Sequence, residues 1–333
     1  MSTKPFFDPT GSPTAVPGFT VGHAHHPEMP TGLSVVLCPE DTVGGLDVGG
    51  SAAGTRQTNG LDPDHLVDRV NAVLFTGGSA FGLDAAGGVV AYLEQRGRGA
   101  PVGPTVVPIV PTAVIFDLPL TGGKGRPDAA MAATACAAAG DGPMARGCVG
   151  AGRGATVGKL FGVPQATKGG LGGASCRVGD LRLGAMVVVN AFGDIIDEDD
   201  RIIAGARTSP EAHELVNTEQ WFTTGQKRPE IKQVTNTTLA VVTTNAKLNK
   251  SQAHKVAALA GHGMVRTINP VNTTYDGDMV FVLSCGDIDA DINGLGVIAA
   301  RLVRMAILDA VRSAGPLGGL PAASGLQPKP RGE

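Results

Sequence analysis

Apolar residues in this chain of 333 residues gather in short runs that are rich in β-branched side chains. Runs of this kind with few charges are typical of buried strands. We therefore predict strands at 33–38, 71–75 and 238–244, a strand with a turn at 182–196, a strand pair at 105–118 and another strand at 279–284. Helical spacing or composition predicts helices in the second half of 76–97, at 128–139, at 250–262 and in the stretch that ends at Ala314.

Strands and helices alternate along the chain, but the strands are short and are interrupted by glycine. This order favours an α/β sandwich over a doubly wound sheet with a nucleotide crevice. Asn249 or Ser251 is predicted to cap one helix, and Asp291 or Asn293 the long one. We expect a loose arm at 1–17, a Gly/Pro-rich tail at 315–333, and a helix followed by an exposed linker at 208–233, where a cut in the chain is tolerated.

Composition and charge narrow the classes of function. The net charge of −3 and the 4% of aromatic residues argue against a nucleic-acid partner. The five cysteines have no regular spacing, which indicates reduced thiols and a cytoplasmic protein. The first residues lack the basic and apolar regions of a secretory signal. No apolar run is long enough to cross a membrane.

Two glycine-rich stretches could be mistaken for phosphate-binding loops. Gly77, Gly78 and Gly82 match neither nucleotide motif, and close helix–strand packing explains them better. In the stretch 147–162, Gly158 and Lys159 lack the earlier Gly and the following Ser or Thr of a P-loop. Lys159 is therefore either a solvated surface residue or a cation held near a reaction centre.

Metal sites are not favoured by the sequence. The HAHH motif (23–26) has no cysteine or carboxylate cluster at ligand spacing beside it. The acidic run 197–201 is typical of a solvated loop. Asp287, Asp289 and Asp291 imitate a calcium loop, but Ile292 stands where that loop requires glycine. We expect neither a metal nor a cofactor.

The stretch 234–245, VTNTTLAVVTTN, allows two interpretations. A threonine at the start of an apolar β-branched run is ordinarily only a good strand former. Alternatively, the chain is cut between Asn236 and Thr237, which makes Thr237 a new N-terminus with both a hydroxyl and an α-amine. Its neighbour Thr238 is a rival for that role.

Several separate blocks of the sequence together resemble one family. The blocks are VGHAHH…TGLSVVL (21–37), AAGTRQT (52–58), VLFTGGSAFGLDAAGGVVAYLE (73–94), GAGRGATVGK (150–159), VVVNAFGDI (187–195), NTTLAVVTTNAKL (236–248) and DGDMVF (276–281). They look like the P1/S58 peptidase family of self-cleaving aminopeptidases, D-esterases and amidases. Within that family the chain looks most like the 6-aminohexanoate-oligomer endo-hydrolases. The resemblance covers roughly residues 18–315.

The resemblance implies a fold, a cut and an assembly. The fold is a four-layer αββα sandwich of the N-terminal-nucleophile-hydrolase kind, here a single domain over 1–333. The cut falls between Asn236 and Thr237 and leaves chains 1–236 and 237–333. The implied assembly is a homotetramer, and the implied substrate is a small oligoamide whose internal amide bonds are hydrolysed.

The resemblance also implies the residues of the site. Thr237 matches the nucleophile, and four further residues match positions that support it: Lys159, Asn190, Asp276 and Asp278. The α-amine that the cut creates has a reference pKa of about 7.7–8.0, so it can accept the hydroxyl proton near neutral pH. Asn190 then offers an oxyanion donor, Lys159 a positive charge, and the aspartates partners for the new ammonium.

Two alternatives remain at this point. One is an L-aminopeptidase/D-esterase or β-aminopeptidase of the same family, and the other is a non-catalytic binding or assembly protein with the same fold. Without the resemblance, Asp276–Gly277–Asp278 reads as a turn with an Asx hydrogen bond.

Overall fold

Two β-sheets lie face to face in the computed structural model, which describes residues 4–228 and 236–332. The larger sheet has six strands in the spatial order β1 (Phe6–Asp8), β12 (Gly170–Val178), β13 (Leu181–Asn190), β16 (Thr237–Ala246), β18 (Met279–Ile288) and β4 (Val43–Val48). The smaller has five, in the order β2 (Thr20–His25), β3 (Gly32–Leu37), β6 (Ala72–Thr76), β9 (Thr112–Val114) and β5 (Thr55–Arg56).

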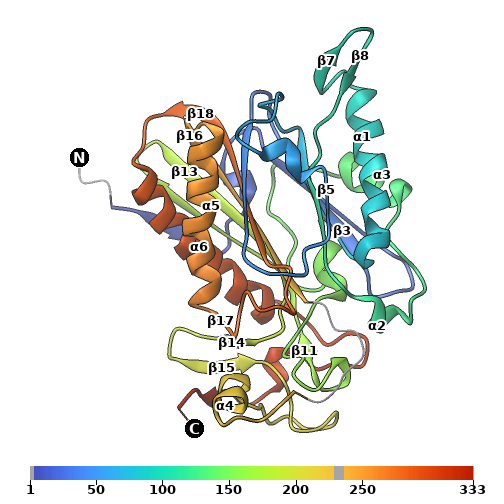
Figure 1. Cartoon of the computed structure of the whole chain (residues 1–333), viewed down its shortest axis with the longest axis vertical. Coiled ribbons are helices and arrows are strands. Elements are labelled where there is room, and N and C mark those ends of the chain that lie inside the picture. The colour runs from blue at the N-terminus through green and yellow to red at the C-terminus, as the bar shows by residue number, and fades with distance from the viewer. Residues whose placement is uncertain (1–3, 229–235, 333) are drawn as a thin grey trace.

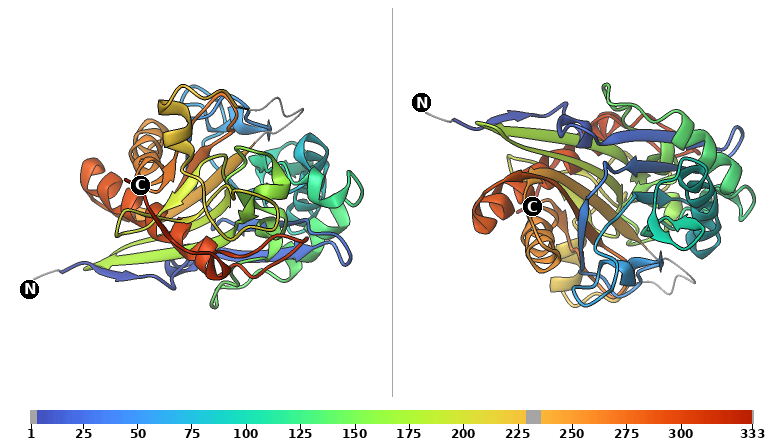
Figure 2. Two further views of the ribbon diagram at one scale, coloured as in Figure 1. Left: turned by 90° about the horizontal axis from the view of Figure 1, so that it is seen from below. Right: turned by 90° about the horizontal axis from the view of Figure 1, so that it is seen from above.

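Helices cover the outer face of each sheet. The long helices α5 (Lys250–Val265) and α6 (Ile292–Arg312) pack on the six-stranded sheet, and α1 (Ala86–Glu94) and α3 (Ala129–Ala137) pack on the five-stranded one. The order from one side of Figure 1 to the other is helices, sheet, sheet, helices, and the two views in Figure 2 show the same layers from the ends. The predicted four-layer αββα sandwich is confirmed.

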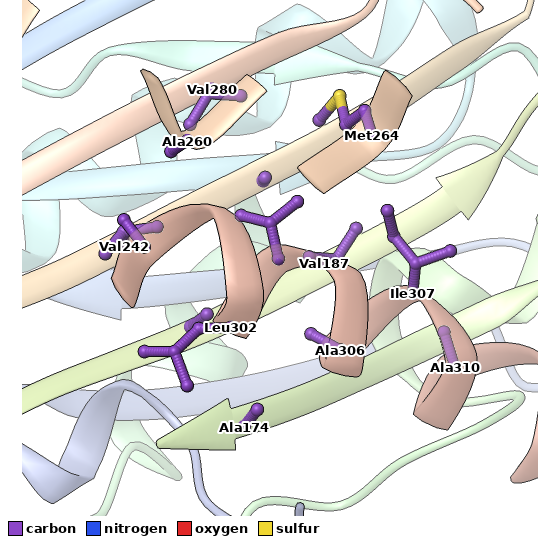
Figure 3. Packing of buried hydrophobic residues seen from close by; sticks show 14 of the residues in the cluster. Ala174, Val187, Val242, Ala260, Met264, Val280, Leu302, Ala306, Ile307 and Ala310 are labelled. Atoms are coloured by element: carbon purple, nitrogen blue, oxygen red, sulfur yellow. The ribbon is translucent and has the colours of Figure 1, made fainter. Parts of the chain in front are cut away.

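Side-chain alternation explains why the central strands are apolar throughout. On β16, Ala240 and Val242 face α5 and α6, whereas Leu239 and Val241 face the second sheet. Both faces of such a strand are buried, so neither face selects polar residues. Figure 3 shows the outer core, where Leu302 and other side chains of α6 lie over the six-stranded sheet.

Smaller elements lie at the ends and the rim of the sandwich. The further strands are β7 (Ala100–Val102), β8 (Thr105–Val107), β10 (Thr156–Val157), β11 (Thr167–Lys168), β14 (Asp194–Ile196), β15 (Arg201–Ala204), β17 (Ile268–Asn269) and β19 (Lys329–Pro330). The further helices are the short α2 (Leu118–Thr121) and α4 (Thr218–Thr223). Strands β17, β14, β15 and β19 form a four-stranded sheet at one end, shown at the bottom of Figure 1.

The helix caps resolve two predicted alternatives. Asn249 caps α5 in a capping box with Gln252, and Asp291 caps α6 by accepting from the N–H of Gly294 at 2.7 Å. The helix predicted within 208–233 is α4. Residues 229–235, where the exposed linker was predicted, lie outside the described residues. No helix of the described residues is both long and apolar enough to cross a membrane.

Three sequence predictions were wrong in detail. The arm at 1–17 is not loose in its described part, because Phe6–Asp8 pair with β12 along its edge. The tail at 315–333 contributes β19 to the four-stranded sheet. The predicted strand pair at 105–118 does not pair with itself, because β8 joins β7 in a hairpin and β9 joins β6 in the five-stranded sheet. The pairings of β1, β9 and β19 join segments distant in sequence, which local patterns do not encode, whereas β7 lies just before β8 along the chain.

Candidate active site

Three central strands bring the predicted site residues to one end of the six-stranded sheet. Thr237 is the first residue of β16, and Asn190, the last residue of β13, is its register partner. Asp276 and Asp278 lie just before β18, which pairs with β16 on its other side. Parallel β16 and β18 start at the same edge, and antiparallel β13 ends there, so the topology collects these residues.

The peptide bond before Thr237 sits inside this cluster. The Thr237 hydroxyl donates to the carbonyl oxygen of Asn236 at 2.5 Å, and the N–H of Gly277 donates to the same oxygen at 2.7 Å. The N–H of Asn236 donates to the carbonyl of Tyr275 at 2.9 Å, which makes a parallel bridge between Asn236 and Asp276. The Thr237 hydroxyl thus lies against a carbonyl that a backbone donor already polarises.

The hydrogen bonds that the Asn190 side-chain oxygen accepts fix the orientation of its amide group. Its Oδ1 accepts from Lys159 Nζ at 2.8 Å and from the N–H and hydroxyl of Thr156 at 3.0 and 3.3 Å. Its Nδ2 is buried and has no hydrogen-bond partner among the described residues. Because unpartnered buried donors are rare in folded proteins, this N–H group is available to an oxygen that enters the site.

Lys159 is held in a buried turn. Gly158 before it has a φ of +73°, and a Cβ there would lie 1.9 Å from the carbonyl carbon of Gly205, so only glycine fits. The Lys159 side chain is 1% exposed, and its Nζ also donates to the carbonyls of Asn190 and Ala191 at 2.9 and 3.4 Å. The alternative of a solvated surface lysine was therefore wrong, and Lys159 lies at the predicted reaction centre.

The two aspartates hold different parts of the site. Asp276 accepts from the N–H of Phe192 at 3.3 Å and from the hydroxyl of Thr273 at 2.6 Å. Asp278 accepts from the N–H of Thr238 at 2.5 Å. Neither carboxylate bonds to Thr237 in the continuous chain. Asp278 instead fixes the backbone just after Thr237, whereas Asp276 holds the backbone at Phe192 and Thr273.

Burial shifts the titration of the charged groups. It lowers the pKa of Lys159 well below the usual lysine value and raises the pKa of Asp276. Burial, with Asp276 as a like charge nearby, raises the pKa of Asp278 to about 7. Lys159 forms no ion pair within the part of the chain that the structure describes. Groups with pKa values moved toward neutrality can exchange protons at working pH, which is the chemistry that hydrolysis needs.

Some contacts of the site were missed by reasoning from the sequence. Thr156 orients Asn190, and the Arg228 guanidinium lies 4.7 Å from the ring centre of Tyr275 and 5.1 Å from that of Phe192. Thr156 stands three residues before Lys159 in a block that carries the resemblance, so its place near the site could have been predicted from that block. Nothing in the local sequence of Arg228 indicates that it reaches two aromatic rings.

His23 and His26 of the HAHH motif have hydrogen-bond partners within the protein. His23 Nδ1 lies 2.8 Å from the hydroxyl of Ser34, and that hydroxyl oxygen accepts from the N–H of Ala151 at 3.1 Å. His26 Nδ1 accepts from the N–H of Met29 at 3.1 Å. Within 4–228 and 236–332, no group of three or more His, Cys, Asp and Glu side chains is placed to hold a metal ion.

The four layers are those of the N-terminal-nucleophile-hydrolase fold. Two solved structures share it. The L-aminopeptidase D-Ala-esterase/amidase from Ochrobactrum anthropi, described as a variant of the Ntn hydrolase fold, matches with a TM-score of 0.70 at 17% identity over 93% of this chain and 88% of its own. A β-aminopeptidase from Burkholderia sp. matches with a TM-score of 0.68 at 21% identity over 92% and 88%.

Sequence comparison gives the family. The model of peptidase family S58 matches residues 12–323. A protein of Mycobacterium leprae named as an uncharacterized aminopeptidase is 37% identical over 96% of this chain and 95% of its own length. A 6-aminohexanoate-oligomer endohydrolase of Kocuria sp. is 30% identical over 89% and 84%. The chain belongs to peptidase family S58.

Proposed function

We propose that this protein is an N-terminal-threonine amidohydrolase that activates itself by cutting between Asn236 and Thr237. The observation that carries the proposal is the Thr237 hydroxyl, 2.5 Å from the oxygen of the preceding carbonyl, with Gly277 donating to that oxygen. Thr237 Oγ1 bonds to the carbonyl carbon, the C–N bond breaks, and the hydroxyl proton ends on the Thr237 nitrogen. Water then hydrolyses the resulting ester, which releases the Asn236 carboxylate and restores the hydroxyl.

The cut supplies the base that turnover needs. An amide nitrogen is not basic, but a free α-amine has a pKa of about 7.7–8.0 and can take the hydroxyl proton. Thr237 is 3% exposed in the continuous chain, so a substrate reaches it only if the cut also opens the site. Thr237 then attacks a substrate amide, the amine product leaves, and water releases the acyl group.

The neighbouring side chains support this reaction. Asn190 Nδ2 is the free buried donor next to Thr237, so it is suited to bind the oxyanion that develops on the attacked carbonyl. Lys159 and Thr156 keep that amide in one orientation through Oδ1. Asp276 and Asp278 are the carboxylates near the new ammonium, and Lys159 adds positive charge beside the reacting oxygen.

Two substrate classes are candidates. Internal amide bonds of 6-aminohexanoate oligomers are favoured by the relatives named 6-aminohexanoate-oligomer endohydrolase and by the paired aspartates. Aminoacyl amides are favoured by the more similar relatives named as aminopeptidases, at 36–37% identity. Amino-capped 6-aminohexanoate oligomers and amino acid p-nitroanilides separate the two, because an aminopeptidase requires the free amine.

The self-cut is tested on purified protein by mass spectrometry under denaturing conditions and by N-terminal sequencing of the smaller piece. We expect pieces of 236 and 97 residues, the second starting at Thr237. Thr237→Ala should remain one chain and lose amide hydrolysis, because no hydroxyl remains. Thr238→Ala is the matched control and should still be cut. An uncut wild-type chain with full activity, or a smaller piece that starts at Thr238, contradicts the proposal.

A further inference from the structure

Lys168 is a fully buried lysine beside the site that the proposed reaction steps do not use. It lies in the short strand β11, opposite Thr156 of β10. Its Nζ donates to the Ala155 carbonyl at 2.6 Å and to the Arg153 carbonyl at 2.9 Å. Within residues 4–228 and 236–332 it forms no ion pair. A buried ammonium held by carbonyls alone is costly, so packing does not account for this lysine.

The Ala155 carbonyl belongs to the peptide group that orients Asn190. This C=O and the N–H of Thr156 point to opposite sides of one planar peptide group. The N–H donates to Asn190 Oδ1 at 3.0 Å, and the carbonyl accepts from Lys168 and from the N–H of Gly169, the latter at 3.0 Å. A positive charge at the carbonyl oxygen polarises the peptide group, which makes its N–H a stronger donor. Lys168 is thus joined to Asn190 through a single peptide group.

The backbone next to Lys168 packs against the same peptide group. A Cβ on Gly169 would lie 2.0 Å from the Val189 carbonyl oxygen and 3.2 Å from the Thr156 nitrogen. Only glycine therefore fits there, in contact both with the end of β13 that carries Asn190 and with the 155–156 peptide. The position of this peptide depends on two donors from β11 and its neighbour, of which only Lys168 brings a charge.

We propose that Lys168 is a positioning residue for the oxyanion donor. It holds the 155–156 peptide so that Asn190 keeps its Oδ1 on Thr156 and its Nδ2 free for the attacked carbonyl. The inference rests on the proposed function, in which Asn190 Nδ2 binds the oxyanion. Without the ammonium the peptide can tilt, and the amide is no longer fixed in one orientation. A preorganised donor acts mainly in the transition state, so the loss falls on kcat and not on KM.

The charge of Lys168 offers a second route to the reaction, which the test has to separate from the first. Burial lowers the pKa of Lys168 to about 8, while the nearby Asp117 and Cys148 favour its charged form and Arg153 disfavours it. Lys168 is therefore charged at neutral pH. It also adds to burial in lowering the pKa of Lys159. If Lys168 acted only in this way, its removal would shift the pH dependence of the reaction and leave the maximal rate unchanged.

The test measures kcat and KM of the cut enzyme from about pH 6 to 9, with the better substrate of the two classes above. Lys168→Met should lower the maximal kcat about tenfold and change KM by no more than about twofold. If that variant does not fold, Lys168→Gln takes its place and should lower the maximal kcat at least about threefold. A profile that is displaced along the pH axis but reaches the wild-type maximum overturns the proposal, and so does a loss confined to KM.

Lys250 gives a matched control for the loss of a buried lysine. Its Nζ likewise donates to backbone carbonyls, those of Gly60, Asp62 and His65. It opens α5, beyond the end of β16 that is opposite to Thr237. Lys250→Met should therefore leave kcat and KM within about twofold of wild type, even if it lowers stability.

The outcome separates this inference from the proposed function. A wild-type chain that is cut before Thr237, with an equal kcat for Lys168→Met and Lys250→Met, rejects the role of Lys168 alone. An uncut wild-type chain with full activity rejects both proposals.

Discussion

His23 is a buried histidine whose surroundings disfavour its charged form. The ring loses solvent through burial and lies near His25, and together these lower the pKa of His23 to about 4. Ser34 can donate its hydroxyl proton to Nδ1, because the oxygen of that hydroxyl already accepts from Ala151. Protonation of Nδ1 would remove this acceptor. The neutral ring therefore belongs to the folded state.

This shift predicts a loss of stability in acid. An unfolded histidine has a pKa of about 6.5, so between pH 6.5 and 4 the unfolded chain binds a proton that the folded chain does not, and unfolding is favoured as the pH falls. His23→Asn keeps an acceptor near Ser34 but cannot titrate. Urea unfolding of the uncut Thr237→Ala chain at pH 7.5 and 4.5, with and without His23→Asn, should show that His23 accounts for about 1–3 kcal/mol of the decrease. Equal decreases in the two chains would contradict this reading of His23.

At the residue scale, the sequence could predict the candidate site residues but not the contacts between them. The resemblance pointed to Asn190 and Lys159 separately, and the structure places Lys159 Nζ 2.8 Å from Asn190 Oδ1. Without the resemblance, a lone lysine after glycines is most often a solvated surface residue. The burial of Lys159 comes from a turn that passes against Gly205, far along the chain. Contacts between distant segments of this kind leave no periodic signal in either one.

At the scale of elements, α6 is the principal cover of the six-stranded sheet. Leu302 on its inner face is fully buried against that sheet, whereas Val297 on the same helix is 72% exposed (Figure 3 shows Leu302). The sequence predicted a helix in the stretch that ends at Ala314, and this helix is α6. The partner of that face was not predictable, because helical spacing says nothing about which strands lie beneath.

A pair of substitutions on α6 measures this packing. Leu302→Ala should lower the free energy of unfolding of the uncut Thr237→Ala chain by about 2–5 kcal/mol, because it removes buried methyl groups and leaves a cavity. Val297→Ala should change it by no more than about 0.5 kcal/mol, since the side chain already faces water. Urea titrations at one protein concentration give both values. Similar losses for the two variants would mean that α6 does not pack as described.

At the scale of the whole molecule, the proposed cut falls inside a continuous sheet. Strand β16 would start the small piece, yet it pairs along most of its length with β13 of the large piece. Helix α6 of the small piece likewise covers β12 and β13. The layers thus cross between the two pieces, so neither piece holds a complete sandwich of its own.

We propose that the two pieces stay together after the cut and assemble as the homotetramer that the family resemblance implies. Separating them would expose the apolar faces of β13 and β16, which are buried on both sides. Size-exclusion chromatography with light scattering of the cut protein should give one peak that contains both pieces, at the mass of four whole chains. Separate elution of the 97-residue piece would contradict the shared sheet, and a peak at the mass of one chain would contradict only the tetramer.

The pairing of β13 with β16 also decides whether refolding is an intramolecular reaction or an association of two molecules. Before the cut, both strands belong to one chain, and their meeting is an intramolecular event whose equilibrium does not depend on dilution. After the proposed cut the same pairing would join two molecules. Refolding from denaturant would then be second order, and its yield would fall as the protein is diluted. A precursor that folds first and is cut second therefore reaches a state to which its separated products return only by association.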